Sequence, residues 1–347
     1  MNARERVLKT FGRLPGKADR VPLQFEMCRP LTEHFSRELG IPAHYTENLY
    51  EDVTYRISAN ELRTAMGNDV VVTGASVSDN YKIEPDAKGQ WLNEYQMLMR
   101  QGDIYVEVAD YPLAHARNRR DIDNFAFPDP DAPGRFRDAE ALVKKYHDEY
   151  LVFGDIEVTV FSLGHQLAGM EKLLVDMMME AEYVIPLFRA CAEFQTEIGL
   201  RLIDKGVDAI WFGDDFGTQQ SLIMDPETFR KQLKPFYTEM IQRFKEKKPD
   251  IIPILHCDGA VSELLKDIHE MGFEVFNPVQ PDVPGHLPRD LKDGFGDLFS
   301  FWGAIDQQEL LPRGSDEELE RDIMEKIKIL GEGGGYMISP AHIIQND

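Results

Sequence analysis

Short apolar segments that alternate with helical patterns constrain the fold of this chain more than any other feature of its sequence. Eight segments carry the apolar run of a buried strand, and most are followed by apolar residues at helical spacing. This alternation indicates a parallel α/β fold, and eight strands are what a closed (β/α)8 TIM barrel needs. An open doubly wound sheet has the same local pattern, so periodicity alone leaves both open. The strand candidates are Val21–Phe25, Asp69–Thr73, Leu151–Ile156, Ala209–Phe212, Ile251–His256, Glu274–Asn277, Phe299–Trp302 and Gly335–Ile338.

Two helices between these strands have clear start signals. Asp225 is a capping residue followed by Pro226 at the first helical position, and an apolar stripe then runs to Phe244. Ser315 and Glu318 form a capping box before a second stripe. The sequence therefore predicts a helix after each of these caps.

Residues 76–130 interrupt the alternation. They contain polar turns, short alternating segments and proline-rich loops, which predict a hairpin-containing excursion between strands two and three that overhangs the barrel mouth. Trp91, Tyr95, Tyr105 and Tyr111 supply apolar surface to bury, which argues against the alternative of a disordered insertion.

The remaining bulk properties fit one barrel domain over residues 1–347. The chain is 43% hydrophobic and 29% charged, as in a globular protein, and we expect no signal peptide and no membrane span. Its three cysteines have no paired spacing, which favours a reducing, cytoplasmic setting. Only a few residues follow the eighth strand candidate, so we expect the final helix to be missing or the chain to be truncated.

The net charge of the chain is -23 at pH 7. Such an acidic surface repels phosphate backbones and anionic lipids, so we expect no nucleic-acid and no membrane partner. It also disfavours a free polyanionic substrate, unless a local basic pocket overrides the field.

A histidine, a thiol and a carboxylate end the fifth strand candidate, at His256, Cys257 and Asp258. Side chains alternate across a strand, so His256 and Asp258 face one way and Cys257 the other. A metal at the barrel mouth would therefore be chelated by His256 and Asp258. The alternative is a hydrogen-bonded structural histidine beside a buried cysteine.

The glycine run Gly333–Gly335 leads into the eighth strand candidate, which delivers His342 to its C-terminal end. Across a barrel mouth, His342 and His256 can converge on one centre. An ordinary helix C-cap is the alternative role of these glycines, and a phosphate-binding loop is excluded because no Gly-Lys-Ser/Thr follows.

Polar residues also follow the other strand candidates. Asp214 and Asp215 stand in tandem after an apolar strand, where one can be structural and the other catalytic, and Gln219 adds an amide. Polar side chains at several strand ends are typical of a barrel's active-site face. The substrate-binding candidates among them are Glu26, Glu157, His165, Asn277 and Asp306.

Several blocks, in order, resemble the uroporphyrinogen decarboxylase superfamily over nearly the whole chain. They are the basic opening up to Pro22, Asp214–Gln219, Leu255–Gly259, Phe276–Pro281, Phe301–Asp306 and Gly333–His342. The resemblance implies a (β/α)8 barrel rather than an open sheet.

True decarboxylases of this superfamily use no metal and bind an eight-carboxylate tetrapyrrole through arginines after the first strand. Here Met27 stands in place of the first arginine, Arg29 is out of register, and Glu26 adds a negative charge. The resemblance therefore does not favour decarboxylation of uroporphyrinogen.

The other branch contains cobalamin-dependent methyltransferases with a zinc site. Their ligands, His-X-Cys at the strand-five block and a Cys at the strand-eight block, correspond here to His256, Asp258 and His342. Zinc accepts this His/Asp/His set, which is less electron-rich than a thiolate site. It fits better with enzymes that resemble anaerobic O-demethylases or methylamine-type methyltransferases than with thiol activation.

The resemblance thus implies a zinc-dependent methyltransferase that exchanges a methyl group between a small substrate and a corrinoid. The corrinoid is expected on a partner protein, because the chain lacks an Asp-X-His-X-X-Gly motif. We expect Asp214 or Asp215 to act as an acid or base, and Tyr336 to close the mouth. Family barrels often form homodimers. The alternatives are a metal-free decarboxylase or lyase of a smaller acid, and a non-catalytic barrel that binds a corrinoid protein.

Overall fold

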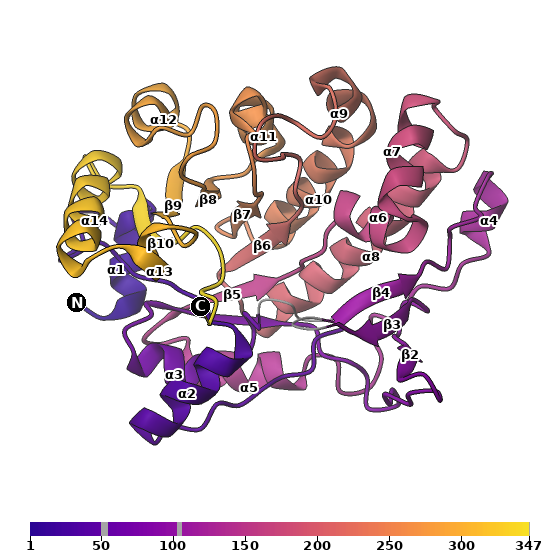
Figure 1. The fold of residues 1–347 in the computed structure, drawn as a ribbon, viewed down its shortest axis with the longest axis horizontal. Helices are drawn as coiled ribbons and strands as arrows, with labels where there is room; N and C mark the ends of the chain where they lie inside the picture. Colours follow the sequence, from indigo (N-terminus) through magenta and orange to yellow (C-terminus); the bar gives the residue numbers. More distant parts are fainter. Residues whose placement is uncertain (50–54, 103–105, 347) are drawn as a thin grey trace.

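Seven parallel strands form a curled sheet at the centre of the molecule (Figure 1). The computed structural model describes residues 1–49, 55–102 and 106–346. The strands are buried almost throughout, as expected for a parallel sheet covered by helices, so the predicted α/β barrel is confirmed. In sheet order they are β1 (Val70–Gly74), β5 (Leu151–Asp155), β6 (Ala209–Gly213), β7 (Ile252–His256), β8 (Val275–Val279), β9 (Ser300–Ile305) and β10 (Tyr336–Pro340).

The first predicted strand, Val21–Phe25, is an extended segment rather than a regular strand. Gln24 N donates to Ile338 O at 3.1 Å, and Ile338 N donates to Pro22 O at 2.9 Å. On its other side, Leu23 O accepts from Asp69 N at 2.8 Å. Pro22 has no N–H to give to a ladder, which helps to explain why the pairing stays irregular. The segment nevertheless connects β10 to the start of β1.

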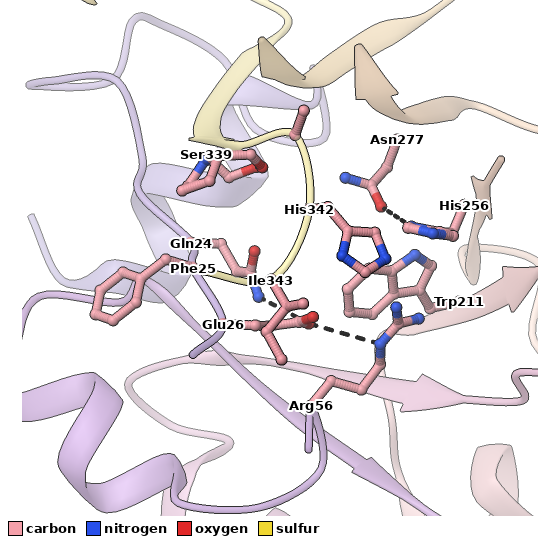
Figure 2. A pocket seen from close by; sticks show the side chains of 12 residues that line it. Gln24, Phe25, Glu26, Arg56, Trp211, His256, Asn277, Ser339, His342 and Ile343 are labelled. Carbon is pink, nitrogen blue, oxygen red and sulfur yellow. Dashed lines mark hydrogen bonds and ion pairs between the residues drawn. The ribbon is translucent and has the colours of Figure 1, made fainter. Parts of the chain in front are cut away.

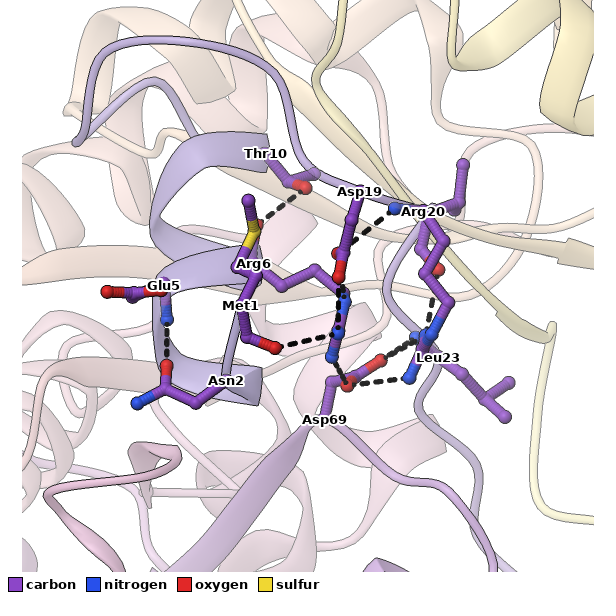
Figure 3. Close-up of polar contacts among 10 residues, drawn as sticks. Met1, Asn2, Glu5, Arg6, Thr10, Asp19, Arg20, Leu23 and Asp69 are labelled. Atoms are coloured by element: carbon purple, nitrogen blue, oxygen red, sulfur yellow. Dashed lines mark hydrogen bonds and ion pairs between the residues drawn. The ribbon is translucent and has the colours of Figure 1, made fainter.

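An ion-pair network fixes this segment to the barrel (Figure 3). The Asp69 carboxylate, which is buried, accepts from Arg6 at 2.6 Å, from Arg20 at 2.6 and 2.9 Å, and from Leu23 N at 2.8 Å. Asp19 accepts from the other side of the Arg6 guanidinium. These charge-assisted bonds tie the first helix and the closing segment to the start of β1.

Helices surround the sheet, and both predicted caps are present. The side chain of Asp225 caps the first of two helices, which are separated at Leu233 because Pro235 lacks the N–H that a continuous helix needs. Ser315 and Glu318 form the expected capping box. The helices around the barrel are α1 (Ala3–Thr10), α2 (Arg29–Leu39), α3 (Asn60–Ala65), α5 (Arg137–Tyr146), α6 (Phe161–Ala168), α7 (Met170–Met178), α8 (Val184–Lys205), α9 (Pro226–Gln232), α10 (Lys234–Lys247), η1 (Ser262–Leu264), α11 (Leu265–Met271), α12 (Pro288–Phe295), α13 (Leu310–Arg313) and α14 (Asp316–Leu330).

The excursion between β1 and β5 forms a small antiparallel sheet, so the predicted hairpin is present. Its strands are β2 (Gln90–Leu92), β3 (Leu98–Gln101) and β4 (Val106–Asp110), and α4 (Arg119–Asp123) follows.

This small sheet lies on the flank of the barrel near α8 (Figure 1). The Tyr95 ring packs edge-on against Phe194 of α8, at 5.6 Å between centroids. Trp91 is also buried, Tyr111 is exposed, and Tyr105 lies outside the described residues. Among the described residues of the 76–130 segment, none lines the pocket at the mouth.

Within the described residues, no helix combines the length and the apolar character needed to cross a membrane.

Candidate metal centre

A pocket lies at the C-terminal ends of the barrel strands, where barrel enzymes carry their active sites. Its floor is the Trp211 ring, and one wall is apolar (Figure 2). Its cavity volume is about 20 Å³, room for roughly one water molecule and well below the range for ligand pockets. The lining residues are Gln24, Phe25, Glu26, Arg56, Trp211, His256, Asn277, Ser339, Pro340, Ala341, His342 and Ile343.

His256, Asp258 and His342 converge at this pocket. His256 ends β7, Asp258 follows two residues later, and His342 lies just beyond the end of β10. The Asp258 Oδ2 atom lies 3.6 Å from Nε2 of His256 and 3.6 Å from Nε2 of His342. The three potential ligand atoms all lie within 4.8 Å of one another. The structure thus brings together all three predicted metal ligands.

The spacing of these atoms fits zinc. Tetrahedral ligands at 2.0–2.2 Å from zinc stand roughly 3.4 Å from one another. Two of the three separations are close to this value, and the third is within 4.8 Å. The set leaves one tetrahedral position without a protein ligand, as in catalytic zinc sites.

Asn277 fixes the orientation of His256. Its Oδ1 atom lies 2.9 Å from Nδ1 of His256, so Nδ1 carries a proton and Nε2 faces Asp258, free to bind a metal once its own proton is lost. Metal-binding histidines typically have such a partner. Asn277, which was predicted to bind substrate, lines the pocket, and this contact orients a potential metal ligand.

The charge of Asp258 dominates the electrostatics of His256. Burial lowers the pKa of His256, but the neighbouring Asp258 carboxylate outweighs burial and raises this pKa to about 9. In the metal-free protein His256 is therefore protonated at neutral pH, and metal binding must displace that proton.

The predicted rim residues Asp215 and Gln219 surround the loop that carries Asp258. Asp215 Oδ1 accepts from the Asp258 backbone N–H at 2.8 Å. Gln219 Oε1 accepts from Gln280 Nε2 at 2.9 Å, and Gln280 Oε1 in turn accepts from Gly259 N at 2.8 Å. Both predicted residues therefore lie near the metal ligands, where they hold the loop in place.

Arg56 is a site residue that the sequence analysis missed. Its guanidinium faces three carboxylates, with Nη1 2.9 Å from Glu157 and 3.6 Å from Asp155, and Nε 3.6 Å from Glu26. It also lies over the Trp211 ring at 4.0 Å, a cation–π contact. The predicted residues Glu26 and Glu157 thus lie at the site, paired with a cation. No motif or periodicity marks an isolated arginine that precedes a short helix.

Asp214 is fully enclosed and anchors the turn after β5. Its carboxylate accepts from Val160 N at 2.8 Å, from Ser162 N, and from the Tyr237 hydroxyl at 2.6 Å. Burial raises the pKa of Asp214 to about 6, against the opposing effect of these hydrogen bonds. The carboxylate does not line the pocket, so its contacts fit the structural member of the Asp214–Asp215 pair.

Three other predicted residues lie away from the pocket. Tyr336 begins β10, at the opposite end of the barrel from the site, and its hydroxyl donates to Gly303 O at 2.9 Å, so it does not close the mouth. Asp306 accepts from Gln308 N at 2.7 Å and caps the turn that follows β9. His165 lies in α6, where burial lowers its pKa to about 4.

Solved structures with the same fold include a methyltransferase from Methanosarcina mazei. The two chains are 16% identical, the match covers 99% of this chain and 94% of the other, and the TM-score is 0.69. A dihydropteroate synthase from Xanthomonas albilineans is 17% identical over 45% of this chain and 56% of its own, with a TM-score of 0.32. No curated protein sequence matches.

The family model of uroporphyrinogen decarboxylase (URO-D) matches residues 106–347, which include the second half of the excursion, β5 to β10 and all three potential metal ligands. This match spans well over half of the chain. The chain therefore belongs to the uroporphyrinogen decarboxylase (URO-D) family.

Proposed function

We propose that this protein is a zinc-dependent methyltransferase that exchanges a methyl group between a small substrate and a corrinoid carried by a partner protein. The convergence of His256, Asp258 and His342 at the C-terminal ends of the strands carries the proposal. The similarity in fold to a methyltransferase supports it.

The chain's own residues suit this role. His256, Asp258 and His342 would hold the ion, and a zinc ion with one open position supplies a Lewis acid for the heteroatom that bears or accepts the methyl group. Asn277 keeps Nε2 of His256 directed at the ion. The small volume of the pocket leaves room only for a small group beside these residues. A corrin ring is far larger than this pocket, which supports a corrinoid presented from outside by a partner.

The same pocket argues against uroporphyrinogen as substrate. An eight-carboxylate molecule needs several cationic side chains, because a carboxylate buried without a counter-charge is strongly disfavoured. Arg56 is the one lysine or arginine among the described lining residues, and it already faces three carboxylates.

Metal content and methyl transfer test the proposal together. We expect about one zinc per chain by elemental mass spectrometry, on the basis of one three-ligand site, and its loss in a His256→Ala/His342→Ala variant. His34→Ala is the matched control, since His34 is exposed on α2. Transfer to cob(I)alamin from small methyl donors, followed by visible absorbance, should need the bound metal. A metal-free protein whose activity survives chelation would instead support a decarboxylase or lyase of a smaller acid.

A further inference from the structure

The carboxylates next to the metal ligands are held by a single buried cation. We infer that Arg56 is a positioning residue that keeps the fourth coordination position of the metal open by holding these carboxylates, above all that of Glu157, away from it. The inference rests on the proposed metal site and concerns what prevents that site from closing.

Glu157 follows the end of β5, and its side chain lies against β6, the strand next to the one that carries His256. Its side chain lies over Gly213, where an added Cβ would stand only 2.7 Å from Glu157 Cγ. Gly213 is paired in register with His256 across β6 and β7. The glycine therefore leaves room for Glu157 to extend beside the metal ligands, and its carboxylate is one of the charges that act on His256.

Arg56 occupies a fixed position between these acids. It is 1% exposed, and its guanidinium packs on Trp211, whose ring lies 6.2 Å from that of His256. From this place Nη1 contacts Glu157 at 2.9 Å, while Nε faces Glu26 at 3.6 Å. Figure 2 shows the guanidinium beside the pocket floor, below His342.

A carboxylate beside a three-ligand zinc site is a potential fourth ligand. Zinc binds carboxylate oxygen as readily as imidazole nitrogen, and four protein ligands give a closed, structural site. The Glu157 side chain is 26% exposed, and a partly buried carboxylate of this kind is stabilised by a nearby counter-charge. While Arg56 supplies that charge, the Glu157 carboxylate is stabilised where it lies and does not bind the metal. Without Arg56, a bound metal ion would offer Glu157 a counter-charge in its place.

Cobalt(II) in place of zinc makes the open position visible, because its absorption bands respond to added ligands. We expect azide to shift the visible bands of the cobalt-loaded wild-type protein. In Arg56→Gln the metal remains bound, but azide affinity falls by about tenfold or more, as is common when an outer partner of a metal site is lost. Arg4→Gln is the matched control, because it breaks an arginine–aspartate pair with Asp208, at the opposite end of the barrel, and azide binding should not change.

A double variant separates positioning from a general structural role. Arg56→Gln/Glu157→Gln removes the competing carboxylate, so azide binding should return. If Arg56→Gln does not fold, Arg56→Lys replaces it, since one amine cannot contact Glu157 and Glu26 together; its weaker azide binding should likewise be restored by Glu157→Gln. Wild-type azide affinity in the variant that folds, or no restoration in the double variant, would overturn the inference. Failure of the wild-type protein to bind cobalt or zinc at all would instead refute the proposed metal site.

Discussion

Removing the hydrogen-bond acceptor of Asn277 should weaken zinc binding without disrupting the fold. Asn277 Oδ1 lies 2.9 Å from Nδ1 of His256, and both side chains are buried. In Asn277→Leu, a His256 that binds metal through Nε2 must keep its proton on Nδ1, where it no longer has a partner.

The magnitude follows from the cost of that unsatisfied group. A buried donor without a partner costs about 1–3 kcal/mol, which corresponds to about a 5- to 150-fold loss of affinity. Changes in the outer partners of metal ligands typically cost roughly 10- to 100-fold, in agreement. We therefore expect zinc affinity to fall by about 30-fold. The metal-free protein escapes part of this cost, because His256 can release the Nδ1 proton and keep the one on Nε2, beside Asp258.

Competition with a chromogenic chelator at neutral pH measures the affinity, and urea unfolding with excess chelator measures the stability of the metal-free protein. Asn277→Asp keeps an acceptor of nearly the same shape, so its zinc affinity should equal or exceed that of the wild type. Wild-type affinity in Asn277→Leu would refute the assigned orientation of His256.

Three further predictions concern stability. Asp69→Asn removes the shared counter-charge of Arg6 and Arg20; because Arg6 keeps Asp19 and Arg20 is half exposed, urea unfolding should show a loss of about 1–3 kcal/mol. Burial lowers the pKa of His286 to about 4, so its neutral form stabilises the fold above pH 6.5, and that stability is lost as the pH falls toward 4. At pH 5 this loss is about 2 kcal/mol relative to a pH above 6.5. Urea unfolding at both pH values should show a smaller loss for His286→Phe. Gly199→Ala places a Cβ 2.4 Å from the Phe244 ring, so the unfolding free energy should drop by about 1–3 kcal/mol while zinc content stays unchanged. Unchanged unfolding free energies would contradict each assignment.

Most of the barrel could be predicted from the sequence, because its strands are continuous apolar runs and two of the helices between them begin at clear caps. Prolines account for two departures. The Val21–Phe25 segment remained irregular at Pro22, and the helix expected after Asp225 was divided before Pro235. The flank position of the excursion depends on contacts such as Tyr95 with Phe194, which apolar content alone does not predict.

The metal ligands were predictable because side-chain alternation and strand ends are local rules. His256 and Asp258 face the same side, and His342 follows the end of another strand of the same sheet, β10. Tyr336 could have been excluded by the same logic, since it begins its strand while the site lies where strands end. Arg56 could not be found in this way, because its role comes from packing on Trp211 among acids that are distant in sequence.

The pairing of Leu23 with Ile338 has a consequence for the order of folding. Two segments near opposite ends of the sequence must meet before the ring is complete, and such distant contacts form slowly because a long loop has to close first. His342 lies just beyond the second of these segments. On the ribosome, the early strands emerge and can pair well before it does. His342 therefore joins His256 only after these two end segments have met, late in the formation of the barrel.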